Sequence, residues 1–314
     1  MDKRDRGLEV GRKLGAWLSG SRSGDMNYEY TALTSTDDDD AEPSSSGAST
    51  PPHAAKPTRR RYTQRLPFRR IFTPNVVSTL ASNALLAFHL GAFNSLWSVF
   101  LSTPVYDPAH PSTPLQRHLP FLFTGGLGLR PREVGLAMAV LGVIGISLQL
   151  LVYPPLAARL GTVRSWRLFL VAFPVAYLCV PFLSLVPSAT PPPAPKDGWP
   201  VWLALLAVIT LQVVGRTFAL PAQTILVNNC TPHPSVLGTV HGIGQSVSSF
   251  AGTVGPVLAG FLYGKGLAAG VVGAVFWGLS AVAVGTVVGS LFVREGDGHE
   301  IWLEGDEEDE ELDA

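Results

Sequence analysis

The chain has 314 residues, a formal net charge of −1, 46% hydrophobic residues and only 15% charged residues. This near-neutral balance favours neither nucleic acid nor an acidic substrate as a partner. Only three acidic and nine basic residues lie between Asn75 and Val293, which excludes an ordinary soluble domain for that region, since about 25% of the residues of soluble domains are charged.

Residues 1–70 are expected to form a disordered cytosolic tail. The stretch STDDDDAEPSSSGASTPPHAAKP is rich in serine, proline and aspartate and cannot bury enough apolar surface to order itself. It is followed by RRRYTQRLPFRR, for which a patch that binds anionic lipid or nucleic acid is one interpretation. We favour a basic flank of the first membrane span, because an apolar segment begins directly after it.

Six apolar segments follow, each at or above the length of about 20 residues that a helix needs to cross a bilayer. Loops or turns are predicted at STPVYDPAHPSTPLQRHLP, PPLAARLGTVR, PSATPPPAPKDG, CTPHP and GKG. The predicted fold class is therefore an all-α membrane protein, with six transmembrane helices within residues 71–293 and an acidic cytosolic tail at 294–314. The spans are expected at Asn75–Leu101, Val134–Tyr153, Trp166–Val186, Val201–Val227, Val236–Tyr263 and Leu267–Val293.

The distribution of lysine and arginine predicts the orientation. If the N-terminal tail is cytosolic, ten basic residues flank the cytosolic span ends and five flank the opposite ends. The positive-inside rule then places both termini in the cytosol, as six crossings require. The sequence leaves the plasma membrane and the vacuolar membrane as equal alternatives.

Catalytic motifs are incomplete in this chain. GKG lacks the leading glycine of a phosphate-binding loop, His299-Glu300 lacks a second histidine four residues on, and GQSVS lacks the closing glycine of a nucleophile elbow. Cys179 and Cys230 fit neither a disulfide framework nor a zinc site. We therefore predict a protein that is not an enzyme and has no cofactor or metal site.

The stretch GIGQSVSSFAGTVGP, residues 242–256, is unusual for a long helix. In water its glycines and proline would weaken a helix, whereas in a bilayer small residues allow helices to approach closely. Six small residues spaced 4, 3, 4, 3 and 4 lie within about 40° of one line on the helix. They predict a helix interface, with gating as a hypothesis: Gly242, Ser246, Ser249, Thr253, Pro256 and Gly260. A shorter version in the second span is Gly135, Ala139 and Gly142.

Three spans also carry polar stripes, which together predict a common wet cavity. Arg216 is the charged residue that lies clearly inside a span, and an intramembrane charge is a functional candidate. The alternatives are that Arg216 braces a gate by bonding backbone carbonyls and that His241 is a structural hydrogen-bond donor. The stripes are Gln212, Arg216 and Gln223 in the fourth span, Asn83 and Asn94 with Trp97 nearby in the first, and His241, Gln245 and Ser248 in the fifth.

Three stretches resemble the C-terminal half of a fungal major facilitator superfamily transporter, in particular the multidrug-resistance-like proton antiporters, a group that includes plant zinc-induced-facilitator-like proteins. The resemblance covers about residues 71–293. The stretches are FTGGLGLRPREVGLAMAVLGVIGI, PPLAARLGTVRSWR and RTFALPAQTILVNNCTPHPSVLGTVHGIGQSVSSFAGTVGPVLAGFLYG.

Two motifs carry this resemblance. Arg159, Gly161 and Arg164 match the family's cytosolic loop motif D-R-x-G-R-R, with Ala158 in the place of the acid. The fifth span is similar to the antiporter motif G-x-x-x-G-P-x-x-G-G. There the matching residues are Gly255, Pro256 and Gly260, whereas Ala251 and Ala259 stand where the family has glycine.

The resemblance implies a secondary transporter of a small solute, coupled to protons and embedded in a lipid bilayer, with no nucleic-acid partner. From the polar stripes we predict substrate or counter-charge contact for Arg216 with Gln212 and Gln223, and proton coupling for His241. Asn83 and Asn94 are predicted to form the cavity wall. The family fold has twelve spans in two halves, so a missing N-terminal six-helix half or a second chain is the expected partner, and we favour a truncated product. The alternative is a non-transporting six-helix scaffold or regulatory fragment that pairs with another transporter chain.

Overall fold

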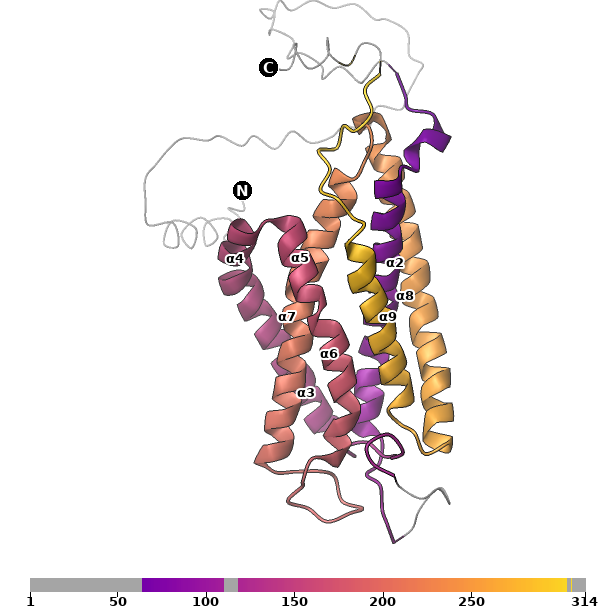
Figure 1. Cartoon of the computed structure of the whole chain (residues 1–314). Coiled ribbons are helices and arrows are strands. Elements are labelled where there is room, and N and C mark those ends of the chain that lie inside the picture. Colours follow the sequence, from indigo (N-terminus) through magenta and orange to yellow (C-terminus); the bar gives the residue numbers. More distant parts are fainter. Residues whose placement is uncertain (1–63, 110–117, 304–305, 307–314) are drawn as a thin grey trace, which may run out of the picture. The chain divides into compact units, whose positions relative to one another are not determined.

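The computed structural model describes residues 64–109, 118–303 and 306. Within these ranges the chain is helical, with one isolated β-bridge between His118 and Leu122 and no β-strand. The elements are η1 (Phe68–Ile71), α2 (Pro74–Ser102), α3 (Pro131–Ser147), η2 (Leu148–Val152), α4 (Tyr153–Leu160), α5 (Thr162–Leu170), α6 (Ala172–Cys179), η3 (Val180–Leu185), α7 (Trp199–Asn229), η4 (Pro234–Val236), α8 (Leu237–Ala268) and α9 (Ala274–Ser290) (Figure 1).

The first span is the single helix α2, which begins where its sequence supplies a start signal. The Thr73 side chain accepts a hydrogen bond from the Val76 backbone N–H, and Pro74 occupies the first helical position, where its missing N–H costs nothing. The 29 residues of α2 span about 44 Å, more than the hydrocarbon core of about 30 Å. The helix predicted at Asn75–Leu101 is confirmed.

The second span is longer than predicted. A continuous apolar helix covers Pro131–Leu160, made of α3, the π-helical turn η2 and α4. Pro154 and Pro155 lack the N–H that would complete the α-helical ladder, and the wider turn lies directly before them. PPLAARLGTVR is therefore mostly helix rather than the predicted turn, and the chain reverses at Gly161, whose φ of +76° favours glycine.

The last two spans differ from the prediction at their boundary. Helix α8 continues through GKG to Ala268, so the predicted turn at this motif is wrong. Gly270, with φ of +71°, follows the end of α8, and α9 begins only at Ala274 and ends at Ser290. Within the described residues five helices are long and apolar enough to cross a membrane, and α9, with 17 residues, is a shorter sixth.

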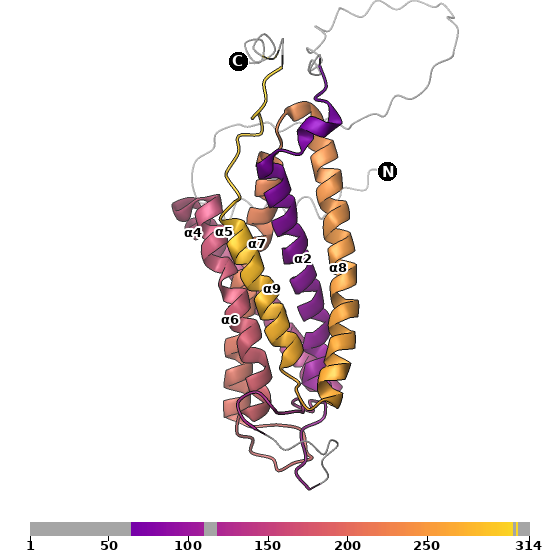
Figure 2. The ribbon, with the colours of Figure 1, turned by 45° about the vertical axis from the view of Figure 1, so that its right-hand side comes forward.

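The helices form one bundle (Figures 1 and 2). Helix α2 packs along α8 and α9, α7 packs on α5 and α6, and α6 packs on α9, while α3 mainly contacts α7. Buried aromatic side chains fill the space between them, including Phe93, Trp166, Phe173, Tyr177 and Phe276. A second buried cluster lies between the starts of α2 and α8 and the end of α7, and includes Ile71, Val76 and Val240.

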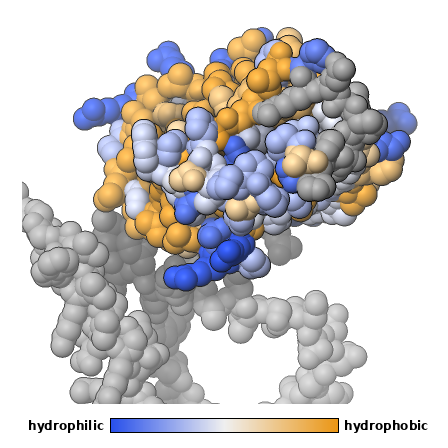
Figure 3. All heavy atoms as spheres, turned by 90° about the horizontal axis from the view of Figure 1, so that it is seen from below, coloured by the Kyte–Doolittle hydropathy of each residue, from blue (hydrophilic) through white to orange (hydrophobic). Residues whose placement is uncertain are grey.

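Hydrophobic side chains also cover the outside of the bundle. On α3 and η2, Val143, Leu150 and Leu151 are 66%, 69% and 74% exposed. Seen end-on, hydrophobic residues form much of the outline of the bundle, and polar residues gather on the end face (Figure 3). Soluble proteins rarely expose apolar surface on this scale, whereas a lipid-facing surface requires it.

Candidate functional site

One polar contact joins two helices on an open face of the bundle. Nη1 of Arg216, in α7, donates a hydrogen bond of 3.3 Å to Oδ1 of Asn94, in α2. Asn94 is exposed and Arg216 is half-buried. No carboxylate among the described residues pairs with Arg216. The guanidinium has five N–H donors and uses one of them on Asn94, so other N–H groups can donate to a bound molecule.

The other polar residues of the α7 stripe point into the bundle. Gln212 is 2% exposed and lies against the Tyr177 hydroxyl without the geometry of a hydrogen bond. The Gln223 side-chain amide donates to the Thr79 carbonyl oxygen at 3.3 Å. Of the three residues of this stripe, Gln212 and Gln223 are therefore buried against neighbouring helices, and only Arg216 reaches the surface of the bundle.

In α2 the predicted cavity residues also separate. The Asn83 amide donates to the Gly244 carbonyl oxygen at 3.2 Å and to the Ser248 hydroxyl at 2.6 Å, so Asn83 joins α2 to α8. Trp97 is 1% exposed and stacks on Phe93. The structure therefore places Trp97 in the hydrophobic core rather than in a wet cavity, since it lies about 60° around the helix from Asn94.

The polar stripe of α8 lies near the end of the bundle where α2 begins. His241 Nε2 hydrogen-bonds Asn228 Oδ1 in the last turn of α7 at 3.3 Å. The Gln245 amide donates to the Ser249 hydroxyl at 3.3 Å, and both side chains are exposed. The three predicted stripes therefore do not close into one cavity within this chain.

Helix α8 carries two stripes of small residues on opposite faces. The stripe that packs on α2 consists of Gly244, Ala251, Gly255 and Ala259. A Cβ at Gly255 would lie 2.5 Å from the Phe88 carbonyl oxygen, so the backbones touch. The predicted stripe faces away from α2, and a Cβ at its Gly242 or Gly260 would meet nothing within 4 Å. Within this chain, Gly255 packs on α2. The predicted stripe does not face α2, and its role as a helix interface stays a prediction: Gly242, Ser246, Ser249, Thr253, Pro256 and Gly260.

The predicted loop motif forms the reversal between α4 and α5. Arg159 lies in the last turn of α4, Gly161 makes the turn, and Arg164 is exposed in α5. Arg167, which the sequence analysis did not single out, makes the firmer contact. Its guanidinium donates to the Ser290 carbonyl oxygen at 3.0 Å and to the Val293 carbonyl oxygen at 2.7 Å, and so satisfies free carbonyls at the end of α9.

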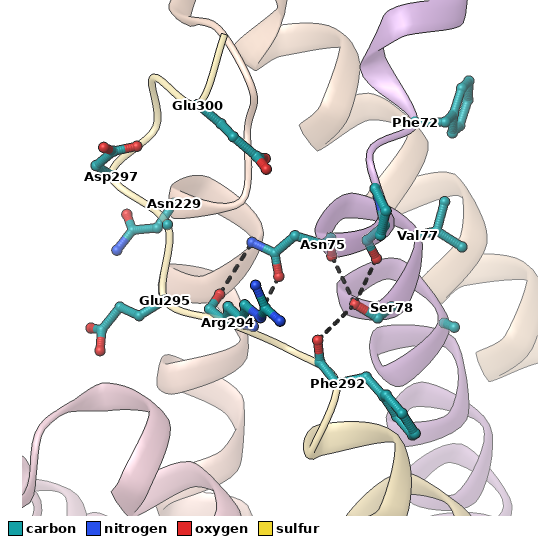
Figure 4. Close-up of a pocket in the computed structure, with 13 residues that line it drawn as sticks. Phe72, Asn75, Val77, Ser78, Asn229, Phe292, Arg294, Glu295, Asp297 and Glu300 are labelled. Carbon is teal, nitrogen blue, oxygen red and sulfur yellow. Dashed lines mark hydrogen bonds between the residues drawn. The ribbon is translucent and has the colours of Figure 1, made fainter.

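The C-terminal segment makes a pocket that sequence reasoning missed (Figure 4). A cavity of about 1150 Å³ lies between the first turns of α2 and residues 292–300. The Asn75 amide donates to the Arg294 carbonyl oxygen at 3.2 Å, and the Arg294 backbone N–H donates back to Asn75 Oδ1 at 2.9 Å. The first residues of the expected acidic tail, 294–303, therefore lie along the end of the bundle, while 304–305 and 307–314 fall outside the described residues.

Fungal transporters are similar to this chain. The "Major facilitator superfamily multidrug transporter mfsB" of Aspergillus fumigatus is 36% identical over 228 residues, which are 73% of this chain and 35% of that protein. "Major facilitator-type transporter psiT2" of Psilocybe cyanescens is 23% identical over 68% of this chain and 38% of its own length. "Efflux pump azaK" of Aspergillus niger is 28% identical over 47% of this chain and 31% of its own length. No protein-family model and no solved structure matches the chain.

The chain spans about a third of the length of these curated relatives, which fits the C-terminal half of such a protein. The long apolar helices and the apolar outer surface agree with an integral, multi-pass membrane protein. Over the segment that these relatives match, this all-α membrane chain belongs to the major facilitator superfamily of transporters.

Proposed function

We propose that this chain forms one half of a secondary transporter, which moves a small solute between two six-helix halves near the bilayer midplane. The observation that carries the proposal is the Asn94–Arg216 contact on an open face of the bundle. Arg216 lies near the middle of the 31 residues of α7. A charged side chain at such a depth in the bilayer costs free energy, and the charges that do occur there usually serve a function.

The chemistry of this pair favours a solute with an acidic or hydrogen-bond-accepting group. The guanidinium offers charged donors in a planar fork, and the Asn94 amide offers both a donor and an acceptor. The relatives named multidrug transporter and efflux pump support a small organic solute that leaves the cytosol.

Drug retention in yeast tests the proposal. This chain is expressed together with the N-terminal six-helix half of the Aspergillus fumigatus relative, in a strain that lacks its own drug pumps. We expect the pair to lower the retained amount of at least one compound in a panel of fluorescent drugs, and neither half alone to do so. Halves that co-purify but leave retention at the vector level contradict transport and support the scaffold alternative.

We also propose that His241 couples transport to protons. Its ring joins the last turn of α7 to the first turns of α8 through Asn228, and an imidazole can accept and release a proton. In His241→Ala, transport by the paired halves is expected to lose most of its dependence on external pH between 5.5 and 7.5, whereas Gln245→Ala keeps it. Transport rates measured across this pH range check the prediction, and an unchanged pH profile in His241→Ala refutes it.

The exposed small-residue stripe of α8 is the proposed contact with the second half. Five of its six members are exposed and Pro256 is half-buried, and small residues are what close helix pairs in lipid require. Ser246→Trp is expected to reduce co-purification of the two halves at least about tenfold, a loss of about 1.4 kcal/mol. Phe261→Trp exchanges one exposed aromatic side chain for another at about 60° around α8 from Ser246, and serves as the control. Equal recovery of both variants contradicts the assignment.

Both tails are proposed to face the cytosol. Four arginines belong to segments that lie at one end of the bundle (Figure 1). They are Arg69 just before α2, Arg159 and Arg164 at the α4–α5 reversal, and Arg294 just after α9. This basic end supports a cytosolic position by the positive-inside rule. The proposal applies equally to a plasma-membrane and a vacuolar protein.

A further inference from the structure

The C-terminal segment is attached to the loop between α7 and α8. The Gly298 backbone N–H donates to the Asn229 carbonyl oxygen at 3.1 Å, and the Ile301 N–H donates to the Pro232 carbonyl oxygen at 2.8 Å. Gly296 approaches so closely that a Cβ there would clash with the Asn229 carbonyl oxygen. These contacts bring side chains from residues 299–303 and 306 against the loop.

Two histidines and an aspartate meet at this attachment. His233 Nε2 lies 3.0 Å from Asp306 Oδ2, and His299 Nε2 lies 3.3 Å from the same oxygen. The side chains of His233 and Asp306 are 0% and 3% exposed, and that of His299 is 10% exposed. All three potential ligand atoms lie within 4.8 Å of one another. We call these residues the His–His–Asp cluster.

Neighbouring groups hold the three side chains in position. His233 Nδ1 lies 2.6 Å from the Ser235 hydroxyl, and the His299 ring stacks on Trp302 with centroids 4.0 Å apart. Burial disfavours the charged form of Asp306, but the Leu303 N–H and both histidines donate to the carboxylate, and its pKa lies below the ordinary value. Partners of this kind fix the orientation of metal ligands in known sites.

The ligand set selects the ion. Two imidazole nitrogens and one carboxylate oxygen are a common zinc ligand set, with bonds of about 2.0–2.2 Å. In a tetrahedral site such bonds place ligand atoms roughly 3.3 Å apart, close to the two Nε2–Oδ2 distances in the cluster. The two histidine nitrogens lie within 4.8 Å of each other, and the rings close on the ion when it binds. His233 Nδ1 accepts a hydrogen bond from the Ser235 backbone N–H at 3.2 Å. A metal bound through Nε2 displaces this contact, because Nδ1 then carries the proton and donates to the Ser235 hydroxyl oxygen. Calcium and magnesium prefer all-oxygen sites and fit this cluster poorly.

We propose that His233, His299 and Asp306 bind a divalent zinc-type ion, with water as the fourth ligand. The ion clips the C-terminal segment to the α7–α8 loop across 73 residues of chain. This site shares no residue with the Asn94–Arg216 contact, and its test requires no transport. No metal site is predicted from the sequence, because the ligands follow no local motif and only the fold brings His233, His299 and Asp306 together.

Cobalt absorption tests the site in the full chain, purified in detergent without a polyhistidine tag. We expect one equivalent of Co²⁺ to give the visible bands of a four-coordinate ion, and Zn²⁺ to displace it. Asp306→Asn and His299→Gln are expected to weaken Co²⁺ binding at least about tenfold. His118→Gln, which changes an exposed histidine in another loop, is expected to stay within about twofold of the unmodified chain.

Two results would overturn the assignment. One is the absence of four-coordinate bands in the unmodified chain at millimolar Co²⁺, which would mean that the cluster is held by hydrogen bonds alone. The other is equal Co²⁺ affinity in Asp306→Asn, His299→Gln and the unmodified chain. Because both variants change the C-terminal segment and no helix of the bundle, far-ultraviolet circular dichroism is expected to show unchanged helicity in each.

Discussion

Replacing Arg216 with glutamine is expected to reduce transport by the paired halves by about ten- to a hundredfold. The substitution keeps a hydrogen-bonding side chain beside Asn94 but removes the charge from the open face of α7. A hydrogen bond to a charged group contributes about 1.5–3 kcal/mol, and each 1.4 kcal/mol corresponds to a factor of ten. The measurement is the initial rate of solute transport at equal amounts of protein in the membrane.

Two further variants give this experiment its controls. Arg216→Lys keeps the charge but loses the planar fork, so intermediate transport is expected. Arg132→Gln removes an exposed arginine at the start of α3, and its transport is expected to equal that of the unmodified chain. If Arg216→Gln also transports at the unmodified rate, Arg216 has no part in solute binding and braces the helices instead.

Substituting alanine at Gly255 is expected to destabilise the bundle by about 1–3 kcal/mol, the usual cost of overpacking. The new Cβ would lie 2.5 Å from the backbone carbonyl oxygen of Phe88. Since a backbone atom has no rotamer to change, α2 and α8 must separate. We expect the melting temperature of the detergent-solubilised chain to fall by several degrees, measured as the loss of the monodisperse peak in size-exclusion chromatography after heating.

The same helix supplies the matched control. A Cβ at Gly260 meets nothing within 4 Å, so Gly260→Ala removes the conformational freedom of a glycine without a clash and is expected to melt within about one degree of the unmodified chain or slightly above it. Equal melting temperatures for Gly255→Ala and Gly260→Ala would show that α2 and α8 do not touch at Gly255.

Hydropathy predicted the spans well because a lipid-exposed helix must be apolar along about 20 residues. The ends were harder to predict. Pro154 and Pro155 predict a turn, yet a π-turn before them allows the helix to continue to Leu160. GKG also predicts a turn, yet glycine is tolerated inside α8, which ends only at Ala268.

The helical periodicity of 100° per residue placed Asn83 and Asn94 on one face of α2, as it should. Periodicity alone does not predict that α8 packs against this face at Asn83 and leaves the Asn94 side chain exposed. The same limit applies to α8, where spacing found one stripe of small residues, and the stripe that packs on α2 lies on the opposite side. Periodicity gives the direction of a side chain, and only the fold gives its neighbour.

The most direct test of the central claim is the water accessibility of the Asn94–Arg216 face within the bilayer. After Cys179 and Cys230 are replaced by alanine, a single cysteine is placed at Asn94, or at the 74%-exposed Leu151 of η2, in the chain paired with its second half. The account predicts that a membrane-impermeant thiol reagent labels Asn94→Cys at least about ten times faster than Leu151→Cys, and that transported solute slows this labelling. Equal and slow labelling at both positions would contradict it, because α2 and α7 would then border lipid rather than a path for solute.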